Sequence, residues 1–130
     1  MTIEALKDLV LMYRKQMKEN KIPVGVIGEV KMARKNARYF AITEIMDNGK
    51  YKITFSGVAL LAGKKSLKNT ILHELCHTCK GAMNHGEKFK KYGKIVYNVF
   101  GENIETHSTQ EENDAVENYK SWMASILFKI

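Results

Sequence analysis

The sequence predicts an α+β domain in which a small three-stranded antiparallel sheet packs on the helix that carries the candidate site, with about four helices in total. Three observations predict this class. Apolar residues recur every three or four positions over residues 3–20, which is helical spacing. Between residues 24 and 55 the spacing shortens to two, which is typical of strands. Helical spacing then returns and continues to residue 127. We expect one domain over residues 1–130, with a core of about 5–100.

The first helix is predicted over residues 3–20. Thr2 is suited to cap its N-terminus, and Pro23 ends the pattern. The apolar positions that would face the core are Ile3, Leu6, Leu9, Val10, Tyr13 and Met17.

Three strands are predicted next. Residues 38–45 and 50–55 alternate between apolar and polar, and Asp47-Asn48-Gly49 between them is a strong hairpin signal. The earlier strand would present to one face Val24, Val26, Gly28, Val30 and Met32. We expect all three strands to pair antiparallel.

The remaining helices follow the strands. Ser66 is suited to cap a helix over about 67–80, which Gly81 would end. Asn84 with Glu87 resembles a capping arrangement for the next helix. A last helix is predicted over about 109–127, with its core-facing positions at Val116, Tyr119, Trp122, Met123, Ile126 and Leu127.

The charge is unevenly distributed. Residues 1–100 hold 19 Lys and Arg against 8 Asp and Glu, whereas residues 101–130 hold 2 against 6. A basic body suits an acidic partner, so nucleic acid is a candidate partner, although a solvated lysine-rich surface explains the same charge. The chain has no run of 18 apolar residues and no signal-like start, so we expect a cytoplasmic protein that has no membrane partner.

A candidate metal site lies in the histidine–glutamate–x–x–histidine pattern at residues 73–77. His73 and His77 are one helical turn apart on the same face, so both can bind one Zn²⁺. Glu74 lies about 100° round the helix, where it could take a proton from water on the metal as general base. His85 is the third candidate ligand, because a glycine before it lets the chain turn back.

The other face of this helix is apolar, so we expect it to pack on the core while the histidines face a cleft. This face carries Leu72, Leu75, Cys76 and Cys79. The two cysteines could form a structural zinc or redox pair, but they lie on the apolar face and we expect them to pack in the core. His107 is interpreted as a solvated histidine.

These residues resemble the SprT-like metallopeptidase domain. The family pattern is HExxH, a short loop, His-Gly and an aromatic residue, and the matching positions are residues 70–77, Asn84-His85-Gly86 and Phe89. The strand-like runs and apolar segment in 37–61 also fit. The resemblance covers about residues 5–100, and most of its specificity lies in 70–89.

The resemblance implies a minimal zincin-like fold, zinc ligation by His73, His77 and His85, and Glu74 as general base and acid. We also expect Phe89 to pack beneath the ligands. Eukaryotic members cut proteins crosslinked to DNA, and a DNA-associated substrate would explain the excess of Lys and Arg in residues 1–100. Many members carry a zinc ribbon after the core, but no cysteine follows Cys79, so this chain resembles a short bacterial or phage form.

We therefore expect a zinc metallopeptidase that acts on a protein or peptide. Two alternatives stay open: a basic nucleic-acid-binding module with a structural zinc site, and a regulatory peptidase that cuts one specific partner. Arg38, Tyr39 and Tyr92 are chemically suited to stabilise an oxyanion, and the sequence does not choose among them. Oligomeric state is not predicted.

Overall fold

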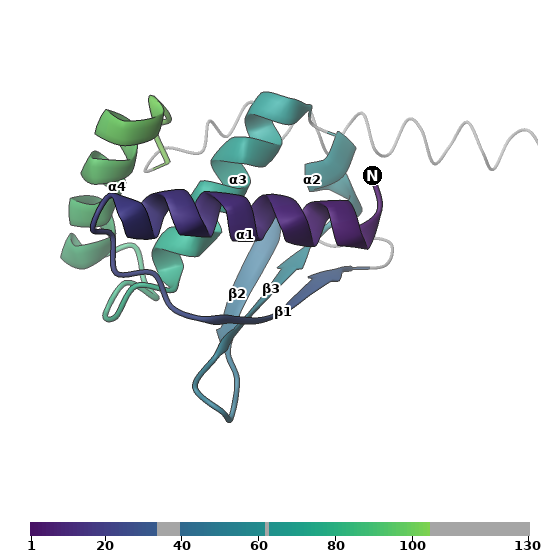
Figure 1. Ribbon diagram of the computed structural model, residues 1–130, viewed down its shortest axis with the longest axis horizontal. Coiled ribbons are helices and arrows are strands. Elements are labelled where there is room, and N and C mark those ends of the chain that lie inside the picture. Colours follow the sequence, from purple (N-terminus) through teal and green to yellow (C-terminus); the bar gives the residue numbers. More distant parts are fainter. Residues whose placement is uncertain (34–39, 62, 105–130) are drawn as a thin grey trace, which may run out of the picture.

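The computed structural model describes residues 1–33, 40–61 and 63–104 (Figure 1). These residues confirm the α+β class. Figure 1 shows α1 and α3 beside each other over the sheet, with α4 and α2 at opposite ends. The elements are α1 (Ile3–Glu19), β1 (Ile27–Met32), β2 (Ala41–Ile45), β3 (Tyr51–Phe55), α2 (Gly57–Leu61), α3 (Lys64–His77) and α4 (Glu87–Phe100).

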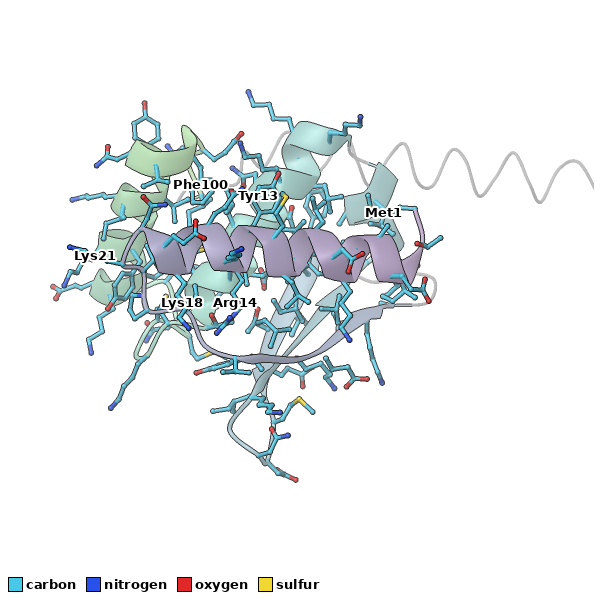
Figure 2. The ribbon with its side chains drawn as sticks, in the orientation of Figure 1. Met1, Tyr13, Arg14, Lys18, Lys21 and Phe100 are labelled. Atoms are coloured by element: carbon cyan, nitrogen blue, oxygen red, sulfur yellow. The ribbon has the colours of Figure 1, made fainter. Side chains whose placement is uncertain are left out.

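Helix α1 forms as predicted. The Thr2 hydroxyl accepts a hydrogen bond from the Ala5 backbone N–H at 3.1 Å, which caps the helix. Its predicted apolar stripe faces the core, with Leu6, Val10 and Met17 fully buried. Figure 2 shows Tyr13 of α1 next to Phe100 of α4, and their ring centroids are 6.2 Å apart in an edge-to-face contact (Figure 2). Helix α1 therefore also supports the end of α4.

The sheet has the order β1-β3-β2, and this order corrects one expectation. Strands β2 and β3 form the predicted antiparallel hairpin, and Gly49 in its turn has a φ of 79°. Strand β1, however, pairs with β3 in parallel. Each strand does reverse direction relative to the one before it, but β3 enters between the other two. Strand β3 supplies the fully buried Ile53 and Phe55, so the most deeply buried strand takes the centre.

One face of the sheet packs on the helices. Helix α1 contacts β1 and α3 contacts β2 (Figure 1). Side chains from both helices and from the sheet form one core, which includes Val30 and Ile53 of the sheet and Ile71 and Leu75 of α3. The opposite face carries ion pairs, such as Lys52 with Glu44 at 3.8 Å.

The starts of the later helices differ from the prediction. Helix α3 begins at Lys64 after Gly63, so Ser66 lies in its first turn and does not cap it. Helix α4 begins after Gly86, and neither helix has a side-chain cap. The Asn84 side chain instead accepts a hydrogen bond from the Gly86 N–H at 3.1 Å, which forms a tight turn before α4. Local capping signals thus located these helices to within a few residues.

Two segments need separate comment: the stretch between β3 and α3, and the predicted C-terminal helix. The short helix α2 was not predicted, and the Ser56 hydroxyl starts it by accepting from the Ala59 N–H at 3.3 Å. The last predicted helix, over about 109–127, lies outside the described residues. In the parts of the chain that the structure describes, no helix combines the length and apolar character needed to cross a membrane.

Candidate metal centre

Helix α3 carries the predicted site, and every residue of its second half, from Thr70 to His77, is buried. Leu72, Leu75 and Cys76 are fully buried, as expected for its apolar face. His73 and His77 are also buried, with 6% and 7% of their surface exposed. Both rings contact Phe89 near the start of α4. His85 is the exposed member of the group.

The structure brings the three predicted histidines together. The Nε2 atom of His73 lies 3.2 Å from Nε2 of His77 and 3.1 Å from Nε2 of His85. One nitrogen from each of the three residues lies within 4.8 Å of the other two. Ligands bound to one tetrahedral zinc ion at 2.0–2.1 Å are about 3.3 Å apart, so the observed spacing fits a single metal ion.

Backbone carbonyl groups set the orientation of the two buried rings. Nδ1 of His73 donates to the Ile104 carbonyl and Nδ1 of His77 donates to the Ala82 carbonyl, both at 2.8 Å. A carbonyl oxygen only accepts, so each Nδ1 carries the proton. In the neutral imidazoles the Nε2 lone pairs therefore point at one another. A cation between them would relieve this repulsion, and this donor set fits a metal ion.

Phe89 forms the floor of the cluster. It is 1% exposed, and its ring centroid lies 4.8 Å from His73, 4.6 Å from His77 and 4.9 Å from His85. This confirms that Phe89 packs beneath the three histidines. A rigid apolar floor restricts the ring orientations and excludes water from one side of the site.

A tight turn brings His85 back to the helix. Helix α3 ends at His77, before the predicted end, and Gly81 lies in the turn with a φ of 80°. A side chain at Gly81 would be strained, and its Cβ would lie 2.7 Å from Lys88 Cδ. The turn also aims the Ala82 carbonyl at His77.

Glu74 is separate from the histidine cluster. Its side chain is 5% exposed, and the Thr43 hydroxyl of β2 donates to its Oε1 at 3.1 Å. Burial raises the pKa of Glu74 from its ordinary value of 4.5 to about 8, although the hydrogen bond from Thr43 lowers it. A carboxyl group near the cluster but outside it is suited to exchange protons with water.

Sequence reasoning missed three groups that organise the site: Thr43 and the carbonyls of Ala82 and Ile104. No sequence pattern marks the two carbonyls. Thr43 did leave a signal, because it is a polar residue in an alternating run at a position that faces the core.

The remaining candidate residues lie away from the histidine cluster or outside the described part of the chain. Cys76 and Cys79 are unbridged and fully buried, which confirms that they pack in the core. Tyr92 packs against the core at its edge. Three of the residues considered above lie outside the described part of the chain, namely Arg38, Tyr39 and His107.

A comparison with protein families bears on this site. The model of the SprT-like family matches residues 6–111, which include all of α3 and α4. No curated protein matches the chain.

Proposed function

The chain belongs to the SprT-like family, and from this and its histidine cluster we propose that it is a zinc-dependent metallopeptidase. The observation that carries the proposal is the convergence of three imidazole nitrogens beside a buried carboxyl group that is held separately. A structural zinc site closes with four protein ligands, whereas a catalytic site keeps one position open. Three histidines with a nearby carboxyl group match the second kind.

In this proposal His73, His77 and His85 hold the metal. Two buried rings oriented by carbonyl groups give fixed donors, and the exposed His85 lies on the side from which substrate can approach. Imidazole donors suit zinc among the available divalent ions. When bound, zinc supplies Lewis acidity and lowers the pKa of a coordinated water to about 7.

Glu74 carries the proton in the proposed reaction. Its carboxylate takes a proton from the attacking water, and the resulting carboxylic acid gives a proton to the amine that leaves as the peptide bond breaks. Glu74 must stay off the metal to do this, and it lies outside the cluster of candidate ligands. The Thr43 hydroxyl donates a hydrogen bond to its Oε1.

The test combines metal content with cleavage of an unfolded protein such as casein. We expect one zinc per chain in the wild-type protein and in Glu74→Gln. Hydrolysis should fall by about 10²- to 10⁴-fold in that variant. Glu44→Gln is a matched control, because Glu44 is exposed on the neighbouring strand. If Glu74→Gln binds zinc and cleaves at the wild-type rate, the mechanism is wrong. If the wild-type protein binds zinc and cleaves nothing, the alternative of a binding module with structural zinc is favoured.

We further propose that the substrates include DNA-associated proteins. An exposed face of α4 supports this, since it carries the four lysines Lys88, Lys90, Lys91 and Lys94. The measurement is the cleavage of a DNA-binding protein and of casein, each with and without single-stranded DNA. The proposal is supported if single-stranded DNA speeds the cleavage of the DNA-binding protein but not the cleavage of casein. Equal rates under all conditions would remove it, and cleavage of a single partner would favour the regulatory alternative.

A further inference from the structure

We propose that Thr43 is a positioning residue of this site, whose hydroxyl holds the Glu74 carboxyl group in the orientation from which it exchanges protons with water. Neither the HExxH pattern nor the histidine cluster includes this residue. Because Glu74 matters here as the proton carrier of the proposed hydrolysis, this role of Thr43 rests on the proposed function.

The sheet places Thr43 against the site. Thr43 lies in the middle of β2, where it pairs with Ile53 of the central strand. Its side chain is on the face that packs on the helices, and only 9% of the residue is exposed. Strand β2 contacts α3 (Figure 1). A polar side chain at this position has to find a partner in the core.

The partner is Glu74, which Thr43 contacts twice. Its Oγ1 lies 3.1 Å from Glu74 Oε1 and 3.2 Å from the Glu74 backbone oxygen. That carbonyl is in the last turn of α3, where backbone acceptors lose their helical donors. The Thr78 N–H, which would reach it in a longer helix, donates to the Leu75 carbonyl instead at 3.0 Å. One hydroxyl therefore ties the Glu74 side chain to its own backbone.

A hydroxyl can keep this contact throughout turnover. It has one proton to donate and lone pairs to accept. When Glu74 is a carboxylate, the hydroxyl donates to it. When Glu74 has taken a proton from water, the hydroxyl oxygen can accept a hydrogen bond from the carboxylic acid while its own O–H donates to the Glu74 backbone carbonyl. Valine has the same shape but can do neither, whereas serine retains both.

A purely structural role makes a different prediction. If Thr43 only satisfied a buried helix end, its loss would lower stability and leave the chemical step unchanged. If it positions Glu74, its loss lowers kcat while KM and zinc binding change little, because the ligands and the substrate surface stay in place.

The experiment uses the full zinc-loaded chain with Thr43→Val, Thr43→Ser and the control Thr54→Val. Thr54 is a half-buried threonine of β3 on the opposite face of the sheet. We expect Thr43→Val to bind one zinc per chain and to have a KM for the substrate within about twofold of wild type. Its kcat should fall by about 10- to 100-fold, as for a lost hydrogen bond to a charged group. Thr43→Ser should recover most of the loss, and Thr54→Val should have the wild-type kcat.

The outcomes separate this proposal from the proposed function. A Thr43→Val protein with wild-type kcat, alongside an inactive Glu74→Gln, overturns the role of Thr43 and leaves the metallopeptidase intact. A zinc-loaded wild-type protein that cleaves nothing overturns both. Loss of zinc or of folding in Thr43→Val, with Thr43→Ser no more active, would show a structural role instead. If Thr43→Val does not fold, Thr43→Ala repeats the comparison with Thr43→Ser.

Discussion

Replacing Glu74 by glutamine is expected to stabilise the metal-free protein at alkaline pH. Burial raises the pKa of Glu74 to about 8 from its ordinary 4.5, so the folded protein favours the protonated carboxyl group. The unfolded chain releases this proton at a lower pH. The contribution of Glu74 to stability is therefore fully present below about pH 4.5 and is lost as the pH rises to about 8. Glutamine has no charge to bury, and its oxygen can still accept from Thr43.

The size of the effect follows from the two pKa values. One pKa unit corresponds to about 1.4 kcal/mol. The interval of about 3.5 units between the ordinary and the raised value therefore costs the wild-type protein on the order of 4 kcal/mol at pH 8. At pH 5 the cost is under about 1 kcal/mol, because this pH lies only about half a unit above the ordinary pKa of 4.5, so ionisation stabilises the unfolded chain only slightly. The advantage of Glu74→Gln should grow by roughly 3 kcal/mol between these two pH values.

The assay is urea unfolding in the presence of a chelator at pH 5 and pH 8. The informative quantity is the difference between wild type and variant at each pH, because this difference cancels the effect of pH on the rest of the chain. Glu44→Gln is the control, because Glu44 has an exposed side chain with a distant partner in Lys52 at 3.8 Å, and its effect should stay within about 0.5 kcal/mol. The reasoning is refuted if Glu74→Gln is no more stable than wild type at pH 8, or if its gain is the same at pH 5.

The residues of the candidate metal centre can also be tested separately. Because His85 is exposed, His85→Ala should change the metal-free unfolding free energy by less than about 0.5 kcal/mol, yet it should remove most of the Tm increase that zinc causes. At 100 times its Kd, zinc should stabilise the wild type by about 2.7 kcal/mol, and thermal melts with and without zinc measure both quantities. An unchanged zinc response in His85→Ala would show that this residue is not a ligand. Phe89→Ala should destabilise the metal-free protein by about 3–5 kcal/mol in urea unfolding, and Phe89→Leu by clearly less, because Phe89 is buried against all three histidine rings. A loss below about 1 kcal/mol in Phe89→Ala would contradict its place as the floor of the site.

Much of the fold follows from local patterns in the sequence. The stripe of α1, its Thr2 cap and the hairpin turn at Gly49 depend on residues close together in the chain, and all three are present. The direction in which β1 pairs was predicted wrongly, because alternation marks a strand but carries no information about its neighbour. The position of β3 depends on which strand buries the most apolar surface, and this is settled only when the whole core assembles.

The candidate site likewise depends partly on local sequence patterns and partly on the packing of distant segments. Local spacing identifies the residues that can meet, because His73 and His77 lie one helical turn apart on the same helix face and the glycine turn returns the chain near them. How they meet depends on the packing of distant segments. The burial of both rings, the carbonyls that orient them and the Thr43 hydroxyl on Glu74 come from segments up to 31 residues away. Such contacts leave no periodic signal, because they depend on distances between elements that only packing sets.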